Sequence, residues 1–254
     1  MTFDLSTIHG WLRLMHVVPG FVGLAAFWVP IFSAKGGRWH VVFGKAFGVC
    51  ALIVIVSALT SSLWMLLDPV GFSGGHEPGG DLQFVGILLG TLAYFTLVAL
   101  VLSLWAVWTR RTPERLAAGW VRTLIAGMGL VSLALMVEGS VRVSGDRMGT
   151  GAILLGLGVA GLRGAWKSYR QVTASHPPRM HWWYLHMEHM LTTGIAFHTA
   201  FTVFGLGRLA GNYLTGPWQL VPWLLPSAIG IPATVFWVRV YQQKFEPTPV
   251  GDKR

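Results

Sequence analysis

Charged residues are scarce in this sequence of 254 residues, because Asp, Glu, Lys and Arg together fill only 11% of its positions. An ordinary soluble domain has about 25% charged residues. A chain of this length with so few charges lacks the polar surface that would cover a globule in water, which excludes an ordinary soluble domain. Hydrophobic residues fill 53% of the positions, and the mean hydropathy is +0.57. We therefore expect most of the folded surface to face a lipid bilayer.

Several kinds of chemistry are also missing from the sequence. Cys50 is the single cysteine, so no disulfide bond can form within the chain, and its apolar neighbours favour a packing role. The sequence contains no GxxxxGK[ST] phosphate-binding loop, no HExxH zinc motif and no CxxC pair. The basic residues are divided among short loops, so the net charge of +9 does not indicate a nucleic-acid partner.

Apolar runs predict an all-α integral membrane protein that forms a single transmembrane domain over residues 1–254. The runs are continuous rather than alternating, which favours helices over membrane strands, and about 20 residues suffice for one span. The seven predicted helices cover approximately 10–32, 41–67, 83–108, 120–140, 148–165, 183–210 and 217–240.

Glycine spacing predicts where these helices approach one another closely. GxxxG pairs occur at Gly44/Gly48 and at Gly86/Gly90, and both indicate packing faces. The shortest run, 148–165, is rich in glycine, which is typical of a helix packed at the centre of a bundle.

The distribution of Lys and Arg predicts the orientation of the chain. Fifteen of these residues lie in the regions 33–45, 109–122, 163–180 and 239–254, and only four lie in the alternate regions. Cytoplasmic loops carry the excess of basic residues, so seven spans place the amino terminus outside and the carboxyl terminus in the cytoplasm. The four basic residues predicted to be external are Arg13, Arg142, Arg147 and Arg208.

Ionisable groups within apolar helices are costly in lipid and are therefore the candidates for function. His16 in the first run lies at a similar depth to Glu138, near the outer end of the fourth run, and to Arg142, which follows Glu138 by one turn. These three residues predict a polar cavity. The alternative for Glu138 and Arg142 is an ion pair between residues four apart on one helix. The alternative for His16 is a hydrogen bond to a neighbouring helix or a backbone carbonyl.

A second group of ionisable residues is predicted at the cytoplasmic face. The segment 180–190 contains His186, Glu188 and His189, and His40 opens the second helix at a similar depth. Histidine and carboxylate at this spacing are compatible with a transition-metal site formed by these four residues. The alternative is an interfacial belt, because the neighbouring tryptophans are typical of that depth.

Two layers of histidine also favour binding of haem b. A haem iron held by two imidazoles needs them on facing helices at one depth. The predicted pairs are His16 with His198 in the outer layer, and His40 with His186 or His189 in the inner layer. Such an arrangement would move electrons across the bilayer.

The run 16–47 reads HVVPGFVGLAAFWVPIFSAKGGRWHVVFGKAF and resembles a bacterial family of multi-span proteins known as domain of unknown function 2306. That family has a His early in one helix, a Gly several residues later, a short basic loop and an H-x-x-x-G opening of the next helix. The matching positions here are His16, Gly23, Lys35, Arg38, His40 and Gly44.

The segment 181–208 is also similar to the family's later H-x-W helix, although the family's His-Arg-Arg-Trp opening is His-Trp-Trp here. The resemblance covers about a third of the chain. It implies a multi-pass protein of the bacterial inner membrane and assigns no reaction.

Three functions remain open from the sequence. The first is a redox or metal-binding membrane protein in which histidines hold haem b or a transition metal. The second is a small-molecule or proton-coupled transporter or channel, with His16, Glu138 and Arg142 in its cavity. The third is a non-catalytic accessory subunit that packs against a membrane-protein partner or a second copy of itself. No residue is assigned a catalytic role, and enzymatic activity is left open.

Overall fold

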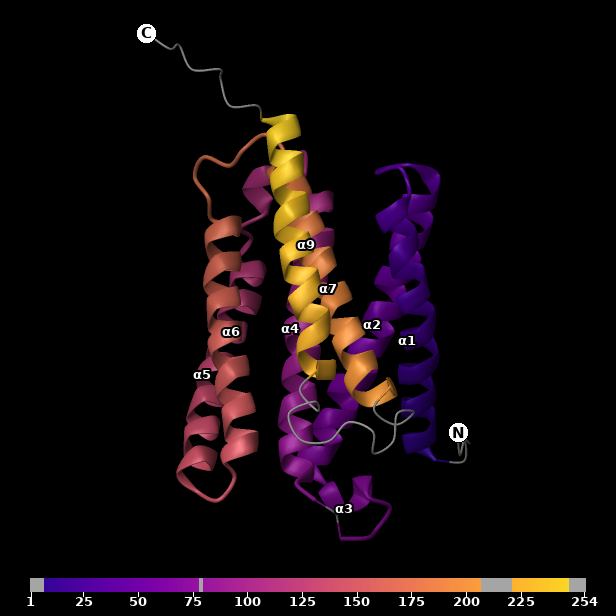
Figure 1. Cartoon of the computed structure of the whole chain (residues 1–254), viewed down its shortest axis with the longest axis vertical. Coiled ribbons are helices and arrows are strands. Elements are labelled where there is room, and N and C mark those ends of the chain that lie inside the picture. The colour runs from indigo at the N-terminus through magenta and orange to yellow at the C-terminus, as the bar shows by residue number, and fades with distance from the viewer. Residues whose placement is uncertain (1–6, 78–79, 207–220, 247–254) are drawn as a thin grey trace. The chain divides into compact units, whose positions relative to one another are not determined.

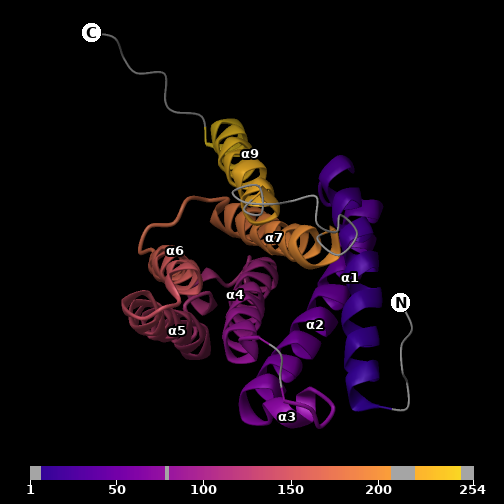
Figure 2. The ribbon, with the colours of Figure 1, turned by 60° about the horizontal axis from the view of Figure 1, so that its bottom comes forward.

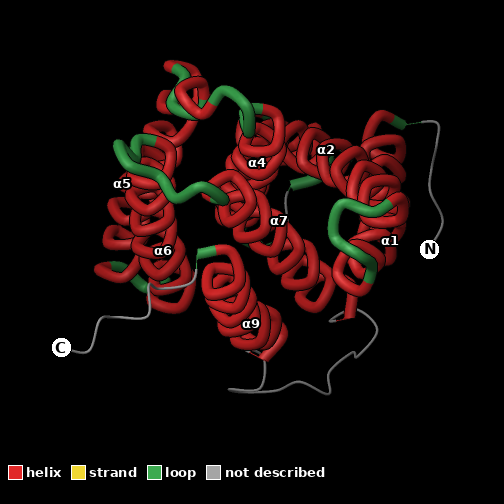
Figure 3. The backbone as a smooth tube through the Cα atoms, turned by 90° about the horizontal axis from the view of Figure 1, so that it is seen from above, coloured by secondary structure: helices red, strands yellow, loops and turns green. Residues whose placement is uncertain are grey.

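A computed structural model of the chain describes residues 7–77, 80–206 and 221–246. Every regular element in these ranges is a helix (Figure 3), which confirms the predicted all-α fold. Six of the helices are long and apolar enough to cross a membrane. They are α1 (Ile8–Phe32), α2 (Arg38–Leu67), α4 (Leu82–Trp108), α5 (Gly119–Ser144), α6 (Met148–Val172) and α9 (Val221–Phe245).

The sixth predicted span corresponds to α7 (His181–Ala200), which continues as one π-helical segment, η2 (Phe201–Leu206). α7 has 20 residues, which is long enough for one span. Its histidines and Glu188 make it less apolar than the other six, and it does not belong to that set. The rest of this predicted run, with Arg208, and residues 217–220 of the last run lie outside the described residues.

Several helices extend beyond the apolar runs that predict them. α6 continues to Val172, although the predicted run ends at 165. Arg and Lys are good helix formers whose long stems stay along the apolar surface, so Lys167 and Arg170 end the hydrophobic pattern without ending the helix. α1 begins at Ile8, because the Thr7 hydroxyl accepts a hydrogen bond from the Gly10 N–H at 3.1 Å and caps the helix. Two short elements, α3 (Pro69–Phe72) and η1 (Pro113–Arg115), lie in the connections.

The described chain divides into two compact units. The first contains the chain up to Val98 together with Arg122–Arg170, and the second contains Ala99–Val121 and the chain from Gln171 onward. The first unit therefore holds α1, α2, α3, the first part of α4, and nearly all of α5 and α6. The second holds the end of α4, η1, α7, η2 and α9.

In the first unit, α1 and α2 form a hairpin (Figures 1 and 2). The rings of Phe27 and Phe47 meet at 5.3 Å between centroids, and Lys35 in the turn donates hydrogen bonds to the last carbonyls of α1 at 2.7 and 2.8 Å. A basic side chain at this place satisfies carbonyls that have no partner within the helix. Tyr94 in α4 donates to the carbonyl of Leu124 in α5 at 2.9 Å, which joins these two helices.

Glycine brings α5 and α6 into backbone contact. A Cβ on Gly151 would lie 2.7 Å from the Gly139 carbonyl oxygen, and a Cβ on Gly139 would lie 2.8 Å from the Gly151 carbonyl oxygen. The glycine-rich run therefore packs closely against α5, while its predicted place at the centre of a bundle stays a prediction. By contrast, a Cβ on Gly156 would meet nothing within 4 Å.

The two predicted GxxxG faces differ. A Cβ on Gly86 would lie 3.3 Å from Met65 Cβ, and one on Gly90 would collide with the Ser62 hydroxyl, so this face of α4 is packed closely against α2. A Cβ on Gly44 would come no nearer than 3.9 Å to Pro30, and one on Gly48 would meet nothing within 4 Å. Gly44 thus faces Pro30 of α1 at van der Waals distance, and Gly48 is buried, so this predicted face is packed, though less closely than the Gly86/Gly90 face.

In the second unit, α7 and α9 lie side by side (Figures 1 and 2). The Trp183 ring contacts Tyr241 and Phe245 with centroid distances of 5.6 and 5.9 Å. Tyr184 donates to Glu246 Oε1 at 3.0 Å, and the Thr202 hydroxyl donates to the Pro222 carbonyl at 2.7 Å. These contacts join the two helices at both ends.

Candidate functional site

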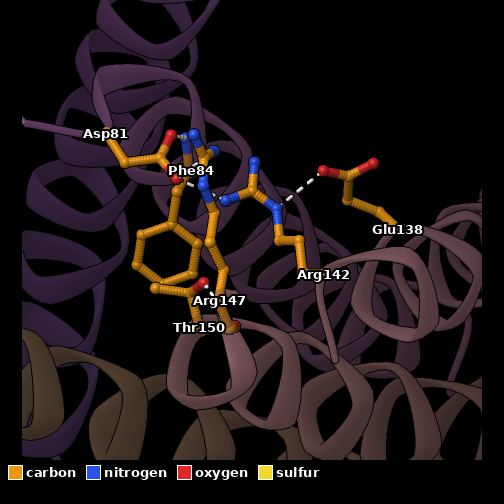
Figure 4. A network of polar contacts seen from close by, with 6 residues as sticks. All are labelled: Asp81, Phe84, Glu138, Arg142, Arg147 and Thr150. Atoms are coloured by element: carbon orange, nitrogen blue, oxygen red, sulfur yellow. Dashed lines mark hydrogen bonds and ion pairs between the residues drawn. The ribbon is translucent and has the colours of Figure 1, made fainter. Parts of the chain in front are cut away.

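A network of four charged side chains joins three segments of the first unit (Figure 4). Asp81 precedes α4, Glu138 and Arg142 lie one turn apart near the end of α5, and Arg147 lies in the connection to α6. The Arg142 side chain is only 5% exposed. Its Nε donates to Glu138 Oε1 at 2.7 Å, while its Nη1 donates to Asp81 Oδ2. Arg147 Nη1 also donates to Asp81 Oδ2, at 3.1 Å.

Asp81 connects this network to the start of α4. Its Oδ1 accepts a hydrogen bond from the Phe84 N–H at 2.9 Å, which is the geometry of a helix cap. Partial burial would raise the pKa of the Asp81 carboxyl. The Phe84 N–H and the two guanidinium groups outweigh that effect and lower the pKa below its usual value. Asp81 is therefore a carboxylate in the folded protein near neutral pH.

The structure brings together two of the three residues predicted to form the polar cavity. Glu138 and Arg142 form the predicted ion pair between residues four apart. His16 Nδ1 instead lies 3.1 Å from the Ser57 hydroxyl on α2, which is the predicted hydrogen bond to a neighbouring helix. Within the described residues, no hydrogen bond or ion pair joins His16 to Glu138 or Arg142.

Sequence reasoning missed Asp81 as the partner of Arg142. The two residues are 61 positions apart, so no helical spacing connects them. One signal was present, because Asp81 immediately precedes an apolar run, the position of a helix cap. That signal identifies a cap but not the arginine that the second carboxylate oxygen contacts.

A cavity of about 760 Å³ lies next to this network, within the first unit. Asp81, Asp146 and Arg147 contribute its charged groups, and Met65, Leu66 and Met148 contribute apolar surface. This cavity is built without His16.

The predicted inner residues are divided between the two units. In the first unit, His40 Nδ1 lies 3.3 Å from the Pro30 carbonyl oxygen of α1. In the second unit, His186 Nδ1 lies 3.0 Å from the Ser103 hydroxyl and 3.2 Å from the Ser103 carbonyl oxygen. Glu188 accepts from Gln171 Nε2 at 2.9 Å, and His189 is buried.

The predicted metal site of His40, His186, Glu188 and His189 gains no support from this arrangement. Over residues 7–77, 80–206 and 221–246, no three or more His, Cys, Asp or Glu side chains are placed to hold a metal ion. Instead, Glu188 contacts the Gln171 amide and His186 contacts Ser103.

The other two histidines of α7 also contact backbone carbonyls. His198 Nδ1 lies 2.7 Å from the Gly194 carbonyl oxygen, one turn earlier on the same helix. His181 makes its contact through the other ring nitrogen, with Nε2 2.8 Å from the Gln171 carbonyl oxygen.

The fold and the site define an all-α protein whose long apolar helices are suited to contact with a lipid bilayer. No family model matches the sequence, and no curated protein or solved structure matches it either. The resemblance to the family known as domain of unknown function 2306 therefore stays a prediction.

Proposed function

We propose that the chain is a multi-span membrane protein that binds haem b through histidines whose rings are already oriented for iron. The observation that carries this proposal is the contact made by Nδ1 in four of the five predicted haem ligands. A histidine that binds a metal through Nε2 usually donates its Nδ1–H to an oxygen, which sets the tautomer and the ring direction.

For three of these residues the acceptor decides where the proton lies. A carbonyl oxygen can only accept, so Nδ1 must be the donor in His40, His186 and His198. In the neutral ring the lone pair is then on Nε2. That nitrogen is the one a haem iron takes.

His16 reaches the same tautomer through a hydroxyl. Ser57 donates its own hydrogen to the Val54 carbonyl at 2.9 Å, so its oxygen is left to accept from His16 Nδ1–H. Ser57 is buried, and this chain of two hydrogen bonds fixes the His16 ring against α2.

His181 provides a contrast within the same protein. Its Nε2 faces a carbonyl oxygen, so the proton lies on Nε2 and that nitrogen is not available to iron. His181 is not among the predicted haem ligands. The contact through Nδ1 is therefore shared by four of the five predicted ligands and not by His181.

Each unit contains such imidazoles at two depths. In the first unit His40 contacts Pro30, which lies 14 residues after His16. The two imidazoles are therefore separated by about 21 Å along α1. In the second unit His186 and His198 are 12 residues apart, or about 18 Å along α7. We propose each imidazole as a haem ligand on its own, without assigning two of them to one iron. A bound haem b would supply a one-electron iron couple, which is the chemistry of electron transfer.

We also propose that the protein lies in a bacterial inner membrane and crosses it seven times, with α7 as the sixth span. Its amino terminus is then outside and its carboxyl terminus is in the cytoplasm. The fifteen basic residues in alternate loops against four elsewhere support this orientation. The length of α7 and its contacts with α9 support its inclusion.

The test is a hemin titration of the detergent-purified full chain, followed by the Soret band. His16→Ala, His40→Ala, His186→Ala and His198→Ala should each weaken the band, whereas His181→Ala, the matched control, should keep the wild-type spectrum. Ser57→Ala keeps every histidine and should lower hemin affinity by about 10–100-fold, the usual effect of losing such a supporting group. Equal effects of His181→Ala and the four other variants, at an unchanged gel-filtration profile, would contradict the proposal.

A further inference from the structure

The cavity beside the charged network lies where several apolar helices end. α2 ends at Leu67, α4 begins at Leu82, α5 ends at Ser144 and α6 begins at Met148. The residues that line the cavity come from the ends of α2, α4 and α6, from the short α3, and from the connections that precede α4 and α6. A membrane helix ends where the hydrocarbon gives way to headgroups and water, so this cavity lies at headgroup depth.

The charges of the cavity are mixed. Arg147 is 62% exposed and uses one guanidinium nitrogen for Asp81, so further N–H donors of the same group remain for a ligand. The carboxylate of Asp146, the preceding residue, is exposed and forms no ion pair among the residues that the structure describes. A cation and an anion thus stand at adjacent positions on the rim.

The net charge decides which headgroup suits the site. Asp81, Glu138 and Asp146 carry three negative charges, and Arg142 and Arg147 carry two positive charges, which leaves the site with one net negative charge. A headgroup with net negative charge would increase that imbalance. A zwitterionic headgroup satisfies both rim charges and does not.

We propose that this cavity binds the phosphoethanolamine headgroup of a phospholipid. The phosphate contacts Arg147, whose planar guanidinium matches phosphate oxygens. The primary ammonium donates hydrogen bonds to Asp146, and the first part of the acyl chains lies along Met65, Leu66 and Met148. A choline headgroup has no N–H to donate, so the carboxylate of Asp146 distinguishes the two. This inference does not depend on haem binding.

The experiment is isothermal titration calorimetry on the full chain in detergent. The probes are dihexanoyl phosphatidylethanolamine, dihexanoyl phosphatidylcholine, dihexanoyl phosphatidylglycerol and free O-phosphoethanolamine. We expect the ethanolamine lipid to bind about tenfold more tightly than each of the others, the effect of one charge-assisted contact. Free O-phosphoethanolamine that binds as tightly as the lipid would overturn the assignment to a lipid.

Two variants and one control assign the contacts. Asp146→Asn should remove the preference for ethanolamine over choline, and Arg147→Gln should weaken all three lipids together. Glu77→Gln removes a carboxylate from an exposed position that does not line the cavity, and it should leave every affinity unchanged. The proposal is overturned if no probe gives saturable binding, if wild type does not distinguish ethanolamine from choline, or if Asp146→Asn retains the preference.

Discussion

Arg142 reaches its two carboxylates through different nitrogens, Nε for Glu138 and Nη1 for Asp81. A lysine ammonium is a single point and cannot occupy both places. We expect Arg142→Lys to lower the free energy of unfolding by about 1.5–3 kcal/mol, the range for hydrogen bonds to charged groups. The measurement is the unfolding midpoint in detergent.

The matched control is Arg147→Lys, because Arg147 binds the same carboxylate from an exposed position. An exposed ion pair contributes less than about 1 kcal/mol, so this change should have little effect on stability. If both arginines tolerate lysine equally, the contacts that Arg142 makes through two nitrogens do not contribute to the stability of the fold.

The carboxylate of Asp81 makes the stability of the first unit depend on pH. Its pKa is lowered in the folded protein, so its contribution is fully present above the unfolded pKa of about 3.9 and is lost as the pH falls through the lower folded pKa. We expect wild type to exceed Asp81→Asn in stability at pH 7 and at pH 5. The difference should shrink once the pH is below about 4. Unfolding midpoints of both proteins at several pH values check this, and a difference that grows on acidification would contradict it.

The residues of the site differ in how far the sequence could reveal their partners. The pair of Glu138 and Arg142 could be predicted because four residues separate them on one helix. The partner of His16 on α2, Ser57, is 41 positions away, and the partner of Arg142 just before α4, Asp81, is 61 positions away. Helical periodicity predicts the face on which a residue lies, but the neighbouring helix on that face is set by packing.

The backbone contact between α5 and α6 leads to a prediction for the hairpin as an element. Gly139→Ala and Gly151→Ala each place a Cβ against a backbone oxygen, which cannot move as a flexible side chain can. Overpacking of this kind typically costs about 1–3 kcal/mol, and we expect that loss in the free energy of unfolding for each variant. Unfolding titrations of the purified variants measure it.

Gly156→Ala is the control on the same helix, since the added Cβ has open space around it. The change replaces glycine by a better helix former, so stability should stay within about 1 kcal/mol of wild type. A loss at Gly156 as large as that at Gly139 would show that helix propensity, and not contact, decides the effect.

The helices themselves were predicted well where apolar runs are long and poorly where polarity changes along them. α4 runs from Leu82 to Trp108 against a predicted 83–108, because its apolar residues continue to both ends. α6 continues beyond the end of its predicted run at 165 to Val172, because its last two turns are basic yet helical. Both GxxxG pairs lie on packed faces, but only Gly86/Gly90 makes a close contact, because GxxxG spacing does not report the size of the facing side chains.

The orientation of the whole molecule rests on the distribution of basic residues. A reporter active only in the cytoplasm, fused after Arg254, should be active, and one fused in the loop between α2 and α4, after Ser73, should be inactive. The second fusion controls for the first. A carboxyl-terminal reporter that is active only outside the cytoplasm would overturn the proposed orientation.

Haem binding is the central claim for the molecule, and the visible spectrum of the purified full chain tests it most directly. Cells supplied with a haem precursor should yield a coloured protein with a Soret band. Reduction with dithionite should shift the Soret band and change the longer-wavelength bands, as expected when a haem iron takes up one electron. The His181→Ala variant should give the same spectrum. A folded protein that is colourless after this growth, and that shows no Soret band when hemin is added, would contradict the account and leave the transporter and accessory-subunit hypotheses to be tested.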